Sequence, residues 1–197
     1  LMHGLFDFII KPVGNRYNNT KKIGDKELII NTRIEEHKNI NRTAVVLAIP
    51  KHYKTSIKVG DEIIVHHNIF RKSYDVRGKA QNSRFYINEE MYACPVDCVF
   101  LYKRNNKWKA VDDYSFIKPL VNDDVYSTNA EKYCVGVIKY CSNFHEPGDI
   151  VGFRNNVEHE FIIDGELLYK IKSNLIQIKY ERKGNEKEYN PSWAQSS

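Results

Sequence analysis

The sequence predicts an all-β protein built from two tandem small β-barrels. Its apolar segments are short, rich in β-branched and aromatic residues, and separated by Gly, Pro, Asn and Asp, which is typical of strands. No stretch keeps a helical apolar period over three turns. A series of motifs also occurs twice along the 197 residues, which predicts two copies of one fold. About five strands per copy favour a small barrel, because closure removes unpaired sheet edges.

Four motifs define each copy. In the first copy they are Phe8–Pro12, Ala44–Ile49, Val59–Val65 and Ile87–Tyr92. In the second copy they are Ser115–Pro119, Val135–Ile138, Pro147–Phe153 and Ile163–Leu168. The alignment pairs Pro12 with Pro119, Val46 with Val137, Gly60 with Gly148 and Ile87 with Ile163, at offsets of 107, 91, 88 and 76. The first copy is therefore longer by 16, 3 and 12 residues in successive gaps, and the Gly-Asp pairs predict tight turns into strands.

The repeat sets the expected domain borders. The first barrel spans 1–112 and the second spans 113–183, with a polar linker over Lys103–Asp113. We expect a flexible tail at 184–197, because this segment has little apolar content and Pro191 blocks regular structure.

Composition excludes several classes of protein. No apolar run approaches the roughly 20 residues of a membrane-spanning helix, and mean hydropathy is −0.56. The start lacks a signal core, so we expect a cytoplasmic protein with no membrane contact. The chain has four cysteines, Cys94, Cys98, Cys134 and Cys141, and they form no CxxC pair. This spacing predicts free thiols, with no zinc site and no other cofactor.

The first long insertion, 13–42, carries one isolated apolar tripeptide. Leu28, Ile29 and Ile30 lie between polar flanks, with Gly24 shortly before them. Burial of each of these side chains stabilises by about 1.5 to 3 kcal/mol relative to exposure. We therefore expect them either to pack within this chain or to bind a partner. The second copy has only a short connection, Val121–Tyr133, at the equivalent place.

The second insertion, 69–84, holds the densest cluster of positive charge on a chain of net charge +5. It could be a solvated basic loop or a surface for an acidic partner. Nucleic-acid binding is a further but less favoured alternative, because basic and aromatic side chains alternate there: Arg71, Lys72, Tyr74, Arg77, Lys79, Arg84 and Phe85.

These features together resemble the GroES-type co-chaperonins, the lid proteins of bacterial chaperonins. The resemblance rests on the strand ending Ile10-Lys11-Pro12, the loop with its tripeptide, and the segments Thr43–Ile49, Ile57–Val65 and Ile87–Tyr102. It implies that Gly24, Leu28, Ile29 and Ile30 form a mobile chaperonin-binding loop. It also implies a folding client and a homo-oligomeric ring, a heptamer in that family.

The ring would need contacts between subunits. We predict an oligomer interface at apolar edge strands of the first barrel, formed by Phe8, Ile9, Ile10, Val99 and Leu101.

Three departures from the family pattern resemble tandem bacteriophage co-chaperonins. Pro50–Ser56 is too short for a roof hairpin, and 69–84 and the second barrel are additions. The resemblance implies a phage-encoded lid acting in the host cytoplasm on capsid or other large clients. The second barrel, which lacks the docking loop, would then be an added tier that enlarges or roofs the cage.

No enzyme is expected. The sequence has no nucleophile elbow, phosphate-binding glycine loop or paired metal motif. His66 and His67 are the best candidates for chemistry, but neighbours on a strand point to opposite faces. The alternative function is a phage structural or assembly protein that uses the barrels without binding a chaperonin.

Overall fold

The computed structural model describes residues 2–17, 20–23, 26–29, 40–88, 91–124, 126–142 and 144–196, with 20–23, 26–29 and 196 described by their backbone alone. Its extended elements are strands, and the helical turns are 3-10 segments of three to five residues. The prediction of an all-β protein is confirmed. Among these residues, no helix has the length and apolar character needed to cross a membrane. The chain divides into two compact units, Leu1–Lys107 and Trp108–Ser197.

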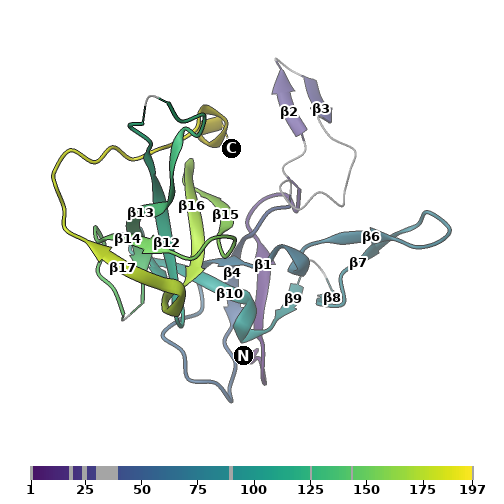
Figure 1. The fold of residues 1–197 in the computed structure, drawn as a ribbon. Coiled ribbons are helices and arrows are strands. Elements are labelled where there is room, and N and C mark those ends of the chain that lie inside the picture. The colour runs from purple at the N-terminus through teal and green to yellow at the C-terminus, as the bar shows by residue number, and fades with distance from the viewer. Residues whose placement is uncertain are drawn as a thin grey trace. The chain divides into compact units, whose positions relative to one another are not determined.

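The first unit is organised around a seven-stranded antiparallel sheet of order β11-β10-β5-β4-β1-β9-β8, whose edge strand β11 runs across the border with the second unit (Figure 1). The strands are β1 (Phe8–Pro12), β4 (Thr43–Ala48), β5 (Glu62–Val65), β8 (Tyr86–Asn88), β9 (Met91–Cys94), β10 (Val99–Arg104) and β11 (Lys107–Ala110). Two separate two-stranded sheets are formed by β2 (Thr20–Ile23) with β3 (Lys26–Ile29) and by β6 (Lys72–Tyr74) with β7 (Ala80–Asn82). Short 3-10 turns are η2 (His67–Ile69) and η3 (Val96–Cys98).

The second unit has a six-stranded sheet of order β15-β16-β12-β13-β14-β17. Its strands are β12 (Tyr114–Val121), β13 (Glu131–Cys141), β14 (Ile150–Phe153), β15 (His159–Ile163), β16 (Glu166–Lys172) and β17 (Ile176–Tyr180). The 3-10 turns are η4 (Ser173–Leu175) and η5 (Ser192–Ser196).

The two sheets share one topology. Without β11, the first reads β10-β5-β4-β1-β9-β8, and the second reads β17-β14-β13-β12-β16-β15. These strands correspond one to one in chain order, and η3 and η4 stand at the same place before the last strand of each. The repeated motifs therefore mark one strand arrangement used twice.

Pairing registers shift the sequence alignment by one residue. Ile10 pairs with Val46 in the first unit, and Ile117 pairs with Ile138 in the second. Val46 therefore corresponds to Ile138, and its alignment with Val137 is wrong. Similar β-branched residues occupy all of these positions, so the sequence alone did not fix the register.

The two Gly-Asp turns have matching hydrogen bonds. Gly60 N donates to Val46 O at 2.8 Å, and Gly148 N donates to Ile138 O at 2.7 Å. Both glycines have positive φ, +90° and +94°, a conformation that other residues adopt only with strain. The predicted tight turns are therefore confirmed at both positions.

The sheets are open in the described residues. The first runs between edge strands β8 and β11, and the second runs between β15 and β17. The closed form of the predicted barrels is therefore not observed. Strand β11 occupies the side of β10 that closure of the first sheet would need.

The expected linker forms a hairpin instead. Asn105 and Asn106, at φ of 51° and 60°, make the turn between β10 and β11. Asn tolerates left-handed geometry at two successive positions, which suits the tight turn of a hairpin. Polar composition did not distinguish this turn from a linker.

The C-terminal segment packs on the second unit, contrary to the expected flexible tail. Leu120 and Glu188 form a β-bridge, and Tyr189 N donates to Pro119 O at 2.8 Å. Ala194 is fully buried in the core beside Ile117 and Leu167. Because this order comes from long-range hydrogen bonds, local composition did not reveal it.

Candidate functional site

The long insertion of the first unit is closed at its base by backbone pairing. Tyr17 and Ile40 form an antiparallel bridge, Asn41 N donates to Arg16 O at 2.9 Å, and Val13 N donates to Thr43 O at 3.0 Å. We call residues 13–17 and 40–43 the loop base. The two residues that flank 18–39 are therefore bridge partners.

Asn41 fastens the two sides of the loop base. Its buried side-chain amide donates from Nδ2 to Val13 O at 2.6 Å and to Asn15 O at 2.9 Å. Its Oδ1 accepts from Thr43 N at 2.9 Å. Removal of this amide would leave two part-buried backbone carbonyls without these donors, which is costly.

Within 18–39, the described residues are the paired strands β2 and β3. Thr20 pairs with Ile29, and Lys21 pairs with Leu28. Leu28 and Ile29 therefore lie on β3. Gly24 and Ile30, the other two predicted chaperonin-binding residues, lie outside the described residues.

The loop base is attached to the second insertion through Arg16. This guanidinium donates to Phe70 O from Nε at 3.2 Å and from Nη2 at 2.8 Å, and to Asn82 Oδ1 from Nη1 at 2.7 Å. It also lies over the Tyr92 ring, 5.3 Å from its centroid. The hydroxyl of Tyr17 adds a second link by accepting from Lys72 N at 2.6 Å. The two additions unique to the first unit thus meet.

Sequence reasoning missed Arg16, Tyr17 and Asn41. Their signal was present, because an arginine and a tyrosine in an otherwise polar loop start, matched by an asparagine just before the next strand, suggest anchoring. Phe70 and Asn82, the partners of Arg16, lie more than 50 residues away in sequence, and those of Asn41 are backbone carbonyls 26 and 28 residues away, so the pairing itself was not readable.

The second insertion forms an exposed ribbon of β6 and β7, which Figure 1 shows extending away from the seven-stranded sheet. We call Lys72–Asn82 the basic ribbon. Asp75 organises its tip: Oδ1 accepts from Arg77 N and from Lys79 N, each at 2.9 Å. The hydrogen bonds from these two amides lower the pKa of Asp75, and the bond from Lys79 N has the larger effect. Gly78 completes the turn at φ +75°.

The cations and aromatic residues predicted at 69–84 do not form one interleaved surface. Arg84 lies over the ring of Phe85, 4.8 Å from its centroid, and so covers a face that a nucleic-acid base would need. Arg71 and Lys72 are half-buried, whereas Tyr74, Arg77 and Lys79 are exposed. The exposed charge is therefore concentrated at the tip of the basic ribbon.

The residues predicted to form an oligomer interface lie in the interior of the first unit. Strand β1, with Phe8, Ile9 and Ile10, is paired on both sides, to β4 and β9. Strand β10, with Val99 and Leu101, lies between β5 and β11. The prediction that these are edge strands is wrong, because β8 and β11 take the edge positions. All five residues except the half-buried Ile9 are core.

His66 and His67 do not sit on a strand. β5 ends at Val65, and His66 caps η2 by accepting from Asn68 N at its Nδ1. The two rings stack with centroids 4.3 Å apart, so the assumption that they point to opposite faces is wrong. Among the described residues, no group of three or more His, Cys, Asp or Glu side chains is arranged to hold a metal ion.

The four cysteines are free thiols in the structure. Burial, reinforced by Asp97, raises the pKa of Cys98 to about 11. Burial also raises the pKa of Cys94, well above its ordinary value. A raised pKa lowers the thiolate fraction, so neither thiol is poised as a nucleophile at neutral pH.

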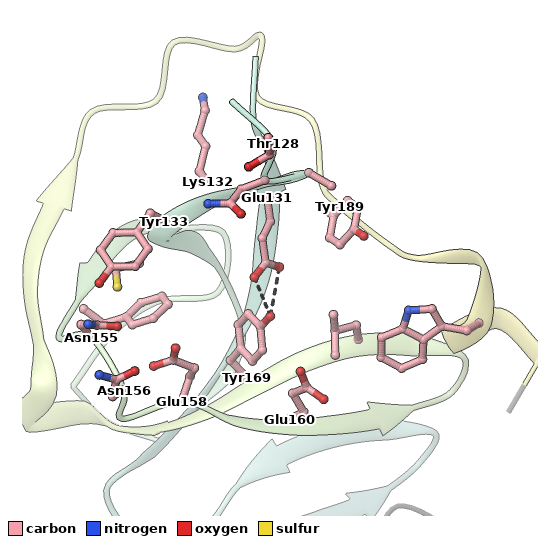
Figure 2. Close-up of a pocket in the computed structure, with 16 residues that line it drawn as sticks. Thr128, Glu131, Lys132, Tyr133, Asn155, Asn156, Glu158, Glu160, Tyr169 and Tyr189 are labelled. Atoms are coloured by element: carbon pink, nitrogen blue, oxygen red, sulfur yellow. Dashed lines mark hydrogen bonds between the residues drawn. The ribbon is translucent and has the colours of Figure 1, made fainter. Parts of the chain in front are cut away.

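The second unit contains a pocket of about 530 Å³ (Figure 2). Its walls come from the connection before β13, the start of β13, the segment from the end of β14 into β15, strand β16 and the C-terminal segment. The lining combines acidic, aromatic and amide side chains, including Glu131, Glu158, Glu160, Tyr133, Tyr169, Tyr189, Trp193, Asn155 and Asn156. We call it the acidic pocket.

The carboxylates of the acidic pocket influence one another. Tyr169 donates its hydroxyl to Glu131, 2.8 Å and 3.0 Å from the two oxygens, as the dashed lines in Figure 2 mark. Burial raises the pKa of Glu131, and the charges of Glu160 and Glu158 raise it further. Lys132 also lines the pocket, but its Nζ pairs with Asp123 at 3.2 Å. The pocket therefore offers a negative environment.

Comparison with known proteins adds no identification: no family model matches the chain, and no curated protein matches it.

Proposed function

We propose that this protein is a co-chaperonin that caps an ATP-driven chaperonin ring and assists protein folding. One observation carries the proposal: two copies of the same strand arrangement differ by a segment, 18–39, that the first copy alone holds on a fastened base. A passive structural module has no need of such a segment. A lid must present an apolar anchor to its ring while its own fold stays intact.

Leu28, Ile29 and Ile30 are the proposed anchor, with Gly24 permitting the turn before it. Burial of three such side chains would contribute several kcal/mol. Ordering a loop costs about 1 to 2 kcal/mol per residue, so one loop binds weakly. Several loops carried on one ring would bind together through avidity, which is why the proposal includes a homo-oligomer, a heptamer by resemblance.

The second unit is proposed to be an added tier of GroES-like fold. It repeats the strand arrangement of the first unit but has no equivalent of 18–39. By resemblance to tandem phage co-chaperonins, this tier would enlarge or roof the folding cage for capsid or other large clients in the host cytoplasm. A fragment of residues 1–112 should then still bind the chaperonin.

The experiment is a pull-down on an immobilised bacterial chaperonin ring with and without ATP. Wild-type protein should be retained only with ATP, and the double variant Ile29→Ser, Ile30→Ser should lose retention. The matched control is Lys21→Ser, Lys22→Ser on β2, which alters the same hairpin and should keep retention. Equal retention of the anchor variant and the wild type would exclude this role for the tripeptide.

A further inference from the structure

Lys72 and Asn82, at the base of the basic ribbon, bond to Tyr17 and Arg16, but within the described residues the hydrogen bonds of its tip are made inside the ribbon itself. Every residue from Val76 to Asn82 is exposed, and Val76 at the tip is fully accessible at 105%. An isolated two-stranded ribbon is marginally stable in water, so this arm gains little from protruding alone. No salt bridge within the described part of the chain uses Arg77 or Lys79.

The ribbon tip is nevertheless well ordered by its own bonds. Asp75 N donates to Lys79 O at 3.0 Å, and Gly78 N donates to Asp75 O at 2.9 Å. The Asp75 carboxylate is turned inward onto two backbone amides and Gln81. The tip therefore presents Val76, Arg77 and Lys79 outward in a preformed turn, which reduces the entropy cost of binding.

The acidic pocket has complementary chemistry. It places three carboxylates beside the rings of Tyr169, Tyr189 and Trp193, and Figure 2 shows Lys132 directed away from the Glu131–Tyr169 pair. Carboxylates and aromatic faces together favour cationic side chains, arginine above all. The aromatic walls also provide apolar contact for a residue such as Val76.

Each feature belongs to one unit alone. The basic ribbon lies in an insertion that the second unit lacks. The acidic pocket is walled by the C-terminal segment and by the connection before β13, where the first unit has its long insertion. The first unit thus carries a basic feature that the second lacks, and the second carries an acidic one.

We propose that the tip of the basic ribbon of one copy docks in the acidic pocket of a second copy. Such a contact joins two different surfaces, so it is heterologous and builds a ring or a filament. Strands β1 and β10, which the sequence predicted to be edge strands that pair between subunits, lie inside the sheet. The proposed contact is therefore an alternative basis for self-association. It concerns association between copies and does not depend on chaperonin binding.

Charge reversal in the full-length chain tests the contact. Arg77→Glu, Lys79→Glu should weaken self-association in sedimentation velocity at least 30-fold, a loss typical of breaking close interfacial charge pairs. Glu158→Lys, Glu160→Lys in the pocket should do the same. The control Lys51→Glu, Lys54→Glu changes two exposed cations elsewhere in the first unit and should leave association unchanged.

Mixing the two reversed variants distinguishes docking from misfolding. The reversed tip of one variant faces the reversed pocket of the other, so the mixture should form hetero-oligomers that neither variant forms alone. Failure of the mixture to associate, with each variant folded by circular dichroism, would overturn the proposal. A wild-type chain that stays monomeric at all concentrations would also overturn it. So would binding of single-stranded nucleic acid by the ribbon, if the charge reversal at Arg77 and Lys79 left self-association unchanged.

Discussion

Arg16 donates a 2.7 Å hydrogen bond to Asn82, and this contact joins the base of the long loop to the end of the basic ribbon. The two segments are separated by 66 residues and are the two largest additions to the first unit. Their attachment to one guanidinium means that each restrains the other.

The substitution Arg16→Ala should therefore loosen both segments. It removes two bonds to Phe70 O and one to Asn82, and bonds from charged donors contribute about 1.5 to 3 kcal/mol each when buried. With Arg16 only half-buried, we expect a loss of about 1 to 3 kcal/mol in unfolding free energy. Hydrogen exchange should rise at residues 40–43 and at the ribbon. Asn82→Ala, which loses only the exposed bond, should cost under about 0.5 kcal/mol.

Acid should destabilise the first unit through Asp61. Burial raises the pKa of Asp61, but bonds from Arg104 and from the Lys58 amide outweigh it, so the pKa is lowered overall. A carboxylate with a lowered folded-state pKa stabilises the fold above its unfolded pKa of about 3.9, and this contribution disappears as pH falls through the folded value. Urea midpoints measured from pH 7 to pH 2.5 should fall more steeply for the wild type than for Asp61→Asn. Parallel curves would contradict this role.

The C-terminal segment should contribute to stability through Asn190. Its Oδ1 accepts from Leu167 N at 2.9 Å and from buried Lys118 Nζ at 3.1 Å, and its Nδ2 donates to Gly165 O at 3.0 Å. Asn190→Ala should lower the unfolding free energy by about 1 to 3 kcal/mol in urea denaturation, because it leaves partly buried groups without partners. The exposed neighbour Gln195→Ala should have almost no effect; equal losses would show that the segment contributes nothing specific.

Thiol reactivity should separate Cys134 from the two cysteines of the first unit. With its pKa raised to about 11, Cys98 should react with iodoacetamide at pH 7.5 roughly 20- to 30-fold more slowly than an ordinary thiol of pKa about 8.5, because the greater nucleophilicity of a more basic thiolate partly offsets its smaller thiolate fraction. Mass spectrometry of timed samples should show Cys98 and buried Cys94 modified after the half-buried Cys134. Urea-unfolded protein should label all four at similar rates, and early modification of Cys98 in the folded chain would contradict its raised pKa.

The sequence was informative where a feature is local. The Gly-Asp turns and the order of apolar motifs depend on short-range geometry, so the repeat and the all-β fold were readable. Features that depend on distant partners were not. The interior position of β1 depends on β9, the order of the C-terminal segment depends on Asn190 bonds, and the acidic pocket assembles from four separate segments.

The candidate site was readable to a similar degree. The tripeptide at Leu28 stood out because three apolar residues are isolated among polar ones. The anchoring of its segment was hidden, because Asn41 and Arg16 act through backbone carbonyls that any residue carries. Sequence patterns indicate side-chain chemistry, but they do not show which backbone carbonyl a side chain will bond to.

The most direct test of the account removes the segment and keeps its base. Because Tyr17 and Ile40 are bridge partners, residues 18–39 can be replaced by an Asn-Gly turn that closes the base as a hairpin. Co-sedimentation with a chaperonin ring should show the full chain bound in ATP and the replaced chain unbound, with equal urea midpoints for the two. Binding of the replaced chain, or no ATP-dependent binding of the full chain, would contradict the proposed co-chaperonin function.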